Sequence, residues 1–206
     1  MPPLNVLFLC TGNLCRSVIG AAVLEEHARA RGVAVRVDSA GLATEGVGPP
    51  RAVVNLLRAR GIDVSSHRSR LLDAALVADA DLVVGAAREH AWEAVALRPS
   101  AIDRVFTVRE LARLVRMVGM PTEGEQLASW TERLHACRST LGPASVGDDI
   151  EDPLHRRRAV YERVACELHE FAAVLVEALA RFDAPLPAHP RCTGATRFPS
   201  GGAEPR

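Results

Sequence analysis

The sequence predicts an α/β fold with a single open, mostly parallel sheet of four strands and helices on both faces. Short apolar segments rich in strand-forming residues alternate with segments of helical periodicity, which is typical of sheets built from parallel strands. The first apolar segment, residues 4–10, has no polar face except Asn5, as in a strand buried on both sides. A chain of 206 residues, 48% of them hydrophobic, can bury one substantial core, so two domains are not the default expectation.

The first half of the chain alternates strand, helix and strand. We expect a strand at residues 4–10 and a helix from Ser17 to Arg31, with Ser17 as its N-cap and Gly32 ending it. Residues 33–37 are expected to form the second strand. The segment from Gly41 to Pro50 contains three glycines and two prolines, which predicts a loop.

The second half continues the alternation. The expected elements are helices at 51–60, 89–97 and from 108 onwards, and strands at 81–84 and 104–107. Apolar residues spaced by four and three predict a last helix, and they are Val160, Val164, Leu168, Phe171, Leu175, Leu179 and Phe182. We assign residues 1–183 to one domain, with a helical insertion at 113–147. Five prolines and three glycines predict that the tail, residues 184–206, is disordered.

Charge and cysteine content narrow the possible partners. The 25 basic and 25 acidic residues balance, so nothing global attracts nucleic acid or an anionic membrane. Five cysteines at irregular spacing predict neither a disulfide framework nor a zinc site, and we expect no metal and no cofactor. The N-terminal apolar run is too short for a signal peptide or a membrane span, which favours a cytoplasmic protein.

The segment between the first strand and the first helix predicts an anion site. A helix N-terminus offers unpaired N–H groups and the positive end of the helix dipole, and a small glycine-containing loop can turn further N–H groups inward. Cys10 lies at the base of this loop, where such a field favours the thiolate. Arg16 lies at its end, where its planar fork can hold two oxygens of a phosphoryl group. A thiolate below the phosphorus atom, with the equatorial oxygens held above it, is the geometry of in-line attack.

The motif is not one of the common nucleotide-binding loops. It lacks both the lysine-containing G-x-x-x-x-G-K-[ST] pattern and the G-x-G-x-x-G fingerprint. Instead, Cys10-x5-Arg16-Ser17 resembles the phosphate loop of low-molecular-weight protein tyrosine phosphatases. Three further segments are similar to family motifs in the same order along the chain: 38–41 (Asp-Ser-Ala-Gly), 66–70 (Ser-His-Arg-Ser-Arg) and 150–153 (Ile-Glu-Asp-Pro). The resemblance covers roughly residues 4–180, with 113–147 as an expansion.

The resemblance implies a role for each site residue. Cys10 would attack the phosphoryl group and form a phosphocysteine, Arg16 would bind the group, and Asp152 would protonate the leaving group as general acid. The phosphate would lie against the loop residues Thr11, Gly12, Asn13, Leu14, Cys15 and Ser17. Ser39 and His67 match positions that support the loop by hydrogen bonds. Cys15 also matches a second cysteine that can pair with the nucleophile under oxidants.

The surroundings of Asp152 and three departures qualify this assignment. Asp148, Asp149 and Glu151 crowd Asp152, and neighbouring carboxylates favour retention of its proton. Val18 stands where the family usually has proline. Leu154 stands where tyrosine is frequent, and the loop at 41–48 has no tryptophan or tyrosine, so two rings that would flank a phenyl group are missing.

Two other functions remain open. An arsenate reductase on the same fold could use Cys10 as nucleophile. The thioredoxin-coupled type needs resolving cysteines, and residues 79–98 contain none. A reductase that uses a small thiol would not need them. A non-enzymatic phosphate-binding module is the other, although the presence of Cys10, Arg16 and Asp152 argues against it. The expected substrate is a phosphorylated protein or a small phosphomonoester, with no nucleic acid or membrane partner.

Overall fold

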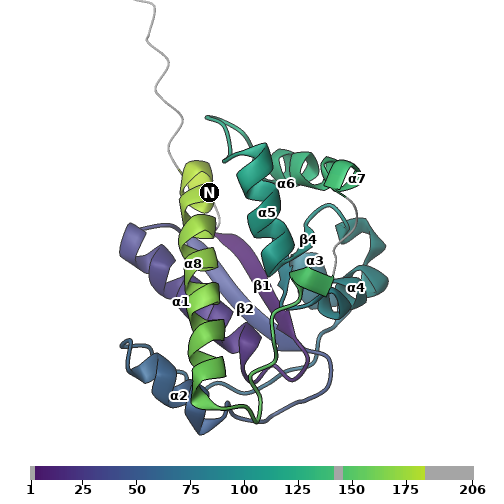
Figure 1. Cartoon of the computed structure of the whole chain (residues 1–206). Helices are drawn as coiled ribbons and strands as arrows, with labels where there is room; N and C mark the ends of the chain where they lie inside the picture. The colour runs from purple at the N-terminus through teal and green to yellow at the C-terminus, as the bar shows by residue number, and fades with distance from the viewer. Residues whose placement is uncertain (1–2, 142–145, 184–206) are drawn as a thin grey trace, which may run out of the picture.

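The computed structural model describes residues 3–141 and 146–183, and these residues contain one open sheet of four parallel strands (Figure 1). The strands are β1 (Leu4–Cys10), β2 (Val35–Gly41), β3 (Leu82–Gly85) and β4 (Val105–Thr107), in the spatial order β2-β1-β3-β4. The predicted fold class is therefore confirmed. Because β1 lies inside the sheet, its last residue, Cys10, is placed at the carboxyl edge between two neighbouring strands, where open α/β sheets bind ligands.

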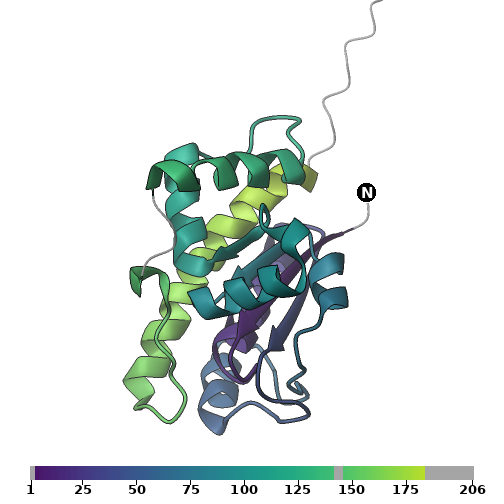
Figure 2. The same cartoon turned by 90° about the vertical axis from the view of Figure 1, so that its right-hand side faces the viewer.

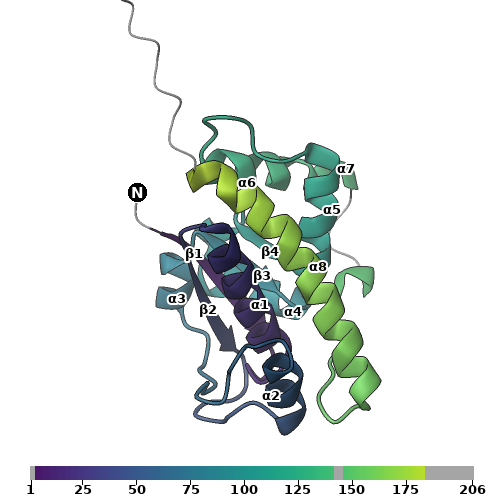
Figure 3. The ribbon, with the colours of Figure 1, turned by 90° about the vertical axis from the view of Figure 1, so that its left-hand side faces the viewer.

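Helices cover both faces of this sheet. Their bounds are α1 Arg16–Arg31, α2 Arg51–Arg58, α3 Ala74–Asp79, α4 Arg88–Leu97, α5 Val108–Val118, α6 Leu127–Ala136, α7 Arg138–Leu141 and α8 Arg158–Asp183, with 3-10 turns at Pro99–Ala101 and Val146–Asp148. Figure 3 shows α1 and α8 side by side over one face. Figure 2 shows the teal α4 in front of the opposite face.

The alternation of side chains along β1 explains the two layers. Val6 and Phe8 point into the core under α1 and α8, whereas Leu7 and Leu9 point into the smaller core under α3 and α4. All four are buried. A continuous apolar run was therefore the correct signal for a strand covered on both faces.

Several predicted boundaries were wrong. Ser17 is not the N-cap: α1 begins at Arg16, and Cys15 precedes it without a side-chain cap, because the Ser17 hydroxyl faces Cys10 and Asn13 instead. The second strand starts later than predicted and runs on to Gly41, which pairs with Cys10. The short helix α3 was not predicted. Gly32 does end α1, in the left-handed conformation that favours glycine.

The helical segment predicted after residue 113 is distributed over three helices. Residues up to Val118 complete α5, and α6 and α7 follow it. Trp130 of α6 is fully buried and packs on Phe182 of α8 with ring centroids 5.8 Å apart, so this segment adds to the core under α8. The predicted disordered tail, 184–206, lies outside the described residues. Within the described ranges, none of the helices has the length and apolarity needed to span a bilayer.

Candidate active site

The candidate nucleophile, Cys10, is the last residue of β1, and the first turn of α1 begins six residues later at Arg16. Its side chain is buried, and Cys10 Sγ lies 3.0 Å from Ser17 Oγ. Ser17 Oγ also accepts a hydrogen bond from Asn13 Nδ2 at 3.0 Å. Because that bond occupies a lone pair of Ser17, the hydroxyl proton can be donated to the sulfur, which stabilises a thiolate.

Asn13 is the centre of the network behind the loop. It is fully buried and adopts a left-handed backbone conformation, with a φ of 49°, that lets the chain curl around the anion site. Its Nδ2 donates to Ser39 Oγ at 2.9 Å, and its backbone carbonyl oxygen accepts from His67 Nε2 at 2.9 Å. Its Oδ1 accepts from the Arg70 backbone N–H at 3.1 Å. The structure therefore brings together Asn13, Ser17, Ser39 and His67, the positions that the family resemblance singles out.

Arg16 is 5% exposed and is held at both ends of its guanidinium fork. Its Nη1 donates to the Ile150 carbonyl oxygen at 3.2 Å, and its Nη2 donates to Thr11 Oγ1 at 3.1 Å and to Asp152 Oδ2 at 2.7 Å. Its Nε is buried and has no partner among the described residues. An unpaired buried N–H costs free energy, so this donor is available to an oxygen of a bound oxyanion.

Asp152 is the ion-pair partner of Arg16, and 45% of its side chain is exposed. Its Oδ1 accepts the Leu154 N–H at 3.1 Å, so the carboxylate bridges the phosphate loop and the start of the next segment. Pro153 follows it directly. A carboxylate that is fixed beside Arg16 and open to solvent on its other side can exchange a proton with a group bound over the loop.

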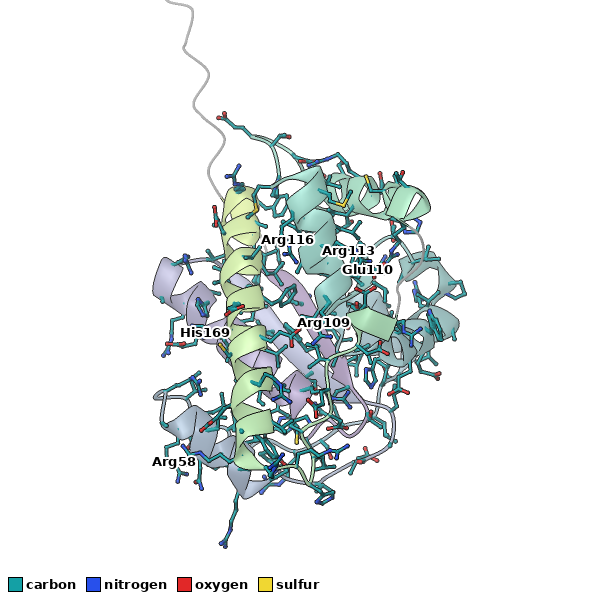
Figure 4. The ribbon with its side chains drawn as sticks, in the orientation of Figure 1. Arg58, Arg109, Glu110, Arg113, Arg116 and His169 are labelled. Atoms are coloured by element: carbon teal, nitrogen blue, oxygen red, sulfur yellow. The ribbon has the colours of Figure 1, made fainter. Side chains whose placement is uncertain are left out.

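Each acidic neighbour of Asp152 has an arginine partner on a different helix, a pairing that the sequence neighbours alone do not predict. Asp148 pairs with Arg113, Asp149 with Arg88 and Glu151 with Arg163. Arg109 also donates to the carbonyl oxygens of Gly147 and Asp149, both at 2.9 Å. Figure 4 labels Arg109 and Arg113, both on α5. These arginines offset the negative charge of residues 148–151 and fix the segment that carries Asp152.

Cys15 is chemically distinct from Cys10. The pKa of the Cys15 thiol is raised to about 12, mainly by burial and in addition by the negative charges of Asp152 and Cys10. Cys15 is therefore a neutral thiol at physiological pH, which excludes it as the attacking sulfur. Both cysteines are free thiols in the structure.

Several residues that contact the site had no role assigned from the sequence, including Arg70, the last residue of the 66–70 motif. Arg70 Nε donates to the Ser39 carbonyl oxygen and its Nη2 pairs with Asp38, both at 2.8 Å, which fastens β2 to the segment of His67. His90 and Glu89 of α4 both contact Thr11. No motif identified them, because α4 reaches the loop only through the topology of the sheet. In the part of the chain that the structure covers, no group of three or more His, Cys, Asp or Glu side chains could hold a metal ion.

Known proteins with similar sequences lead to one family. Residues 5–121 match the family described as "Low molecular weight phosphotyrosine protein phosphatase". A probable low molecular weight protein-tyrosine-phosphatase EpsP of Ralstonia solanacearum is 34% identical over 108 residues, which are 52% of this chain and 72% of that protein. An arsenate reductase of Brevibacillus brevis is 35% identical over 101 residues, 49% of this chain and 71% of that protein.

Solved structures agree with the sequence matches. The low molecular weight protein tyrosine phosphatase from T. tengcongensis has a TM-score of 0.64 and 28% identity, covering 84% of this chain and 98% of that one. A variant of the YwlE arginine phosphatase, with serine in place of cysteine and that active-site serine phosphorylated, has a TM-score of 0.65. It is 23% identical, with 86% of this chain and 97% of that chain covered, and shows likeness of fold.

Proposed function

Because this chain belongs to the low molecular weight phosphotyrosine protein phosphatase family, whose members are enzymes with phosphocysteine chemistry, we propose that it hydrolyses phosphotyrosine-type phosphomonoesters through Cys10. The observation that carries the proposal is the placement of Cys10 Sγ 3.0 Å from the Ser17 hydroxyl, in a loop closed by the buried Arg16. A stabilised sulfur nucleophile and an arginine with an unsatisfied Nε–H converge on one anion site.

In the first step, the Cys10 thiolate attacks phosphorus in line with the leaving oxygen. The S–P bond forms as the P–O bond to the leaving group breaks, and the equatorial oxygens are held by loop N–H groups and Arg16. Asp152, in its protonated form, gives its proton to the departing phenolate, so a neutral phenol leaves. For this, the Asp152 carboxyl must face the leaving oxygen, and Arg16 then keeps its contacts with Thr11 and Ile150.

In the second step, water hydrolyses the phosphocysteine. Asp152, now ionised, takes a proton from the attacking water, the new P–O bond forms, and the S–P bond breaks to return the Cys10 thiolate and inorganic phosphate. The Ser17 hydroxyl stabilises the leaving thiolate as it stabilised the attacking one. The same acid therefore serves both steps, first in its protonated and then in its ionised form.

The substrate we propose is a phosphorylated protein or a small phosphomonoester. Leu154, whose N–H binds Asp152, and the loop at 42–48 supply no aromatic ring. This lowers the expected selectivity for a phenyl ring over other leaving groups. Phosphoarginine belongs in the substrate panel, because an arginine phosphatase shares the fold.

The Cys10–Cys15 pair supports a redox proposal at the same site. Both thiols are buried in one short loop, and Cys15 lies next to the arginine that binds the phosphoryl group. A peroxide would oxidise the Cys10 thiolate to a sulfenic acid, which removes one of the negative charges that raise the pKa of Cys15. The Cys15 sulfur would then displace hydroxide from the sulfenic acid, with loss of water overall, and the resulting disulfide would be inactive and protected from further oxidation. We propose that the enzyme acts in a reducing compartment, the cytoplasm, where this disulfide would be reversible.

Steady-state hydrolysis of p-nitrophenyl phosphate, a phosphotyrosine peptide and a phosphoarginine peptide at about pH 6 under reducing conditions tests the proposal. Turnover by the parent and its loss in Cys10→Ser are the expected results. Asp152→Ala should lose more activity on the phosphotyrosine peptide than on p-nitrophenyl phosphate, because the tyrosine phenolate is the poorer leaving group. A folded, reduced parent that turns over none of the three substrates would refute the phosphatase function.

Arsenate reduction is the second candidate, and the arsenate reductase among the relatives favours it. Arsenate has the shape and charge of phosphate, so the same loop could bind it and Cys10 could attack it. Between residues 79 and 98 the structure places no cysteine that could resolve such an adduct, so a small external thiol would have to act as reductant. Thiol-dependent arsenate reduction by a phosphatase-inactive parent would establish this alternative.

A further inference from the structure

His90 is a buried histidine beside the phosphate loop that the proposed chemistry does not use. It lies in the first turn of α4, and its side chain has no exposed surface. Burial, first of all, and the nearby charge of Arg16 lower its pKa to about 4, so the ring is neutral at the pH of the proposed reaction. A buried neutral imidazole has one N–H donor and one nitrogen acceptor that need hydrogen-bond partners, and the structure contains a partner for each.

The backbone fixes which ring nitrogen carries the proton. The Ala87 N–H donates to His90 Nδ1 at 2.9 Å, so Nδ1 is the acceptor and Nε2 bears the hydrogen. His90 Nε2 lies 3.0 Å from Thr11 Oγ1 and 3.2 Å from Glu89 Oε1. The Nε2–H therefore donates toward the Thr11 hydroxyl, with the Glu89 carboxylate beside it.

The Thr11 hydroxyl passes this constraint to Arg16. A hydroxyl has one proton and two lone pairs, and Thr11 Oγ1 faces His90 Nε2, Arg16 Nη2 at 3.1 Å and Glu89 Oε1 at 3.4 Å. Its two lone pairs accept from His90 and Arg16, and its proton points to Glu89. With the His90 donor in place, Thr11 is held as an acceptor for Arg16.

This contact matters most when Asp152 acts on the leaving group. Among the described residues, the Arg16 side chain donates hydrogen bonds to three partners, Thr11, Asp152 and the Ile150 carbonyl oxygen. When Asp152 faces the substrate, only Thr11 and Ile150 keep the guanidinium in place over Cys10. We propose that His90 is a positioning residue that acts through the Thr11 hydroxyl to hold Arg16 in its phosphoryl-binding orientation.

The proposal rests on the proposed function of the same site, and phosphate affinity separates the two. Inorganic phosphate is the probe, measured both as a competitive inhibitor and by the dependence of the melting temperature on its concentration. Phosphate binding needs Arg16 but no turnover. A parent protein that turns over no phosphorylated substrate would refute the proposed function, while the phosphate affinities of the variants would still test the role of His90.

The variants are His90→Ala, His90→Gln, Thr11→Val and the double variant His90→Ala/Thr11→Val. We expect His90→Ala and Thr11→Val each to weaken phosphate binding and lower kcat/KM by roughly 3- to 10-fold, the range for one buried hydrogen bond. The double variant should bind phosphate no more weakly than the single variant with the lower affinity, because both substitutions break the same chain of hydrogen bonds. His90→Gln keeps a buried N–H donor and should recover part of the loss.

A control and two opposite outcomes complete the test. His169→Ala removes a histidine from α8, at the site labelled in Figure 4, and should leave phosphate affinity unchanged. A folded His90→Ala with parental phosphate affinity, or losses that multiply in the double variant, would overturn the proposal and leave His90 as a cap of α4. If His90→Ala does not fold, parental phosphate affinity in Thr11→Val overturns it equally.

Discussion

Gly41 is the residue at which a single added methyl group should damage the phosphate loop. It ends β2 beside Cys10, and an ideal Cβ there would lie 2.7 Å from Asn13 N, 2.8 Å from Thr11 O and 2.9 Å from Gly12 C. All three atoms belong to the loop backbone, so no side chain can rotate away. Restoring ordinary contacts of about 3.4 Å requires a displacement of roughly 0.5–0.7 Å in the loop.

The size of the effect follows from that displacement. A misplacement of about 1 Å in a reacting geometry can cost roughly 100-fold in rate, so Gly41→Ala should lose about 10- to 30-fold in kcat/KM. Overpacking at a buried site costs about 1–3 kcal/mol of unfolding free energy, which a domain of this size can tolerate. The variant should therefore fold and still be a poor enzyme, with weaker inhibition by inorganic phosphate.

Gly20→Ala is the matched control. A Cβ at Gly20 would lie 2.7 Å from two ring carbons of Phe8, so the clash is comparable but falls on a side chain in the core under α1. Urea unfolding of both variants, with kcat/KM on p-nitrophenyl phosphate, separates loop damage from general destabilisation. Parental kcat/KM in folded Gly41→Ala, or an equal loss in Gly20→Ala, would refute the reasoning.

Three further predictions concern charges. Arg113→Met removes an ion-pair partner of Asp148, whose side chain is only 3% exposed, and should cost at most about 3 kcal/mol in urea unfolding, because Arg113 itself is 35% exposed. Arg113→Met/Asp148→Asn should recover most of that loss, and no recovery would contradict the pairing argument. Burial and the charge of His169 lower the pKa of His27, so the folded protein binds fewer protons than the unfolded chain. Stability should therefore fall as pH drops below about 6.5, and the melting temperatures at about pH 7.5 and 5.5 should differ less in His27→Gln than in the parent. Because its raised pKa keeps Cys15 a neutral thiol, iodoacetamide at about pH 7 should leave it unmodified in the folded protein, as peptide mass spectrometry can check.

The parts of the fold and site that lie in short contiguous segments could be predicted from the sequence. β1 was identified because Leu7 and Leu9 fill one core while Val6 and Phe8 fill the other, which leaves an apolar run with no polar face in its centre. The loop from Cys10 to Arg16 was identified because the strand before it and the helix after it fix where its ends lie. Local spacing was enough in both cases.

The N-cap of α1 shows where local rules failed. Serine before an apolar helix normally caps it, so Ser17 was assigned that role. In the structure the Ser17 hydroxyl is used by Cys10 and Asn13, and the helix begins one residue earlier without a side-chain cap. The orphan N–H groups that a cap would have satisfied are the groups that an anion site needs, so the missing cap and the predicted phosphate site have one cause.

The acidic segment before Asp152 shows why the remaining electrostatics could not be predicted. By sequence, four carboxylates lie within residues 148–152 and should repel one another. In space, Asp148 pairs with Arg113, 35 residues away in sequence, and Asp149 with Arg88, 61 residues away, because α4 and α5 follow strands that end at the same edge of the sheet as β1. The charges around Asp152 therefore depend on sheet topology, and a prediction that counts only sequence neighbours leaves out the arginines that pair with Asp148 and Asp149.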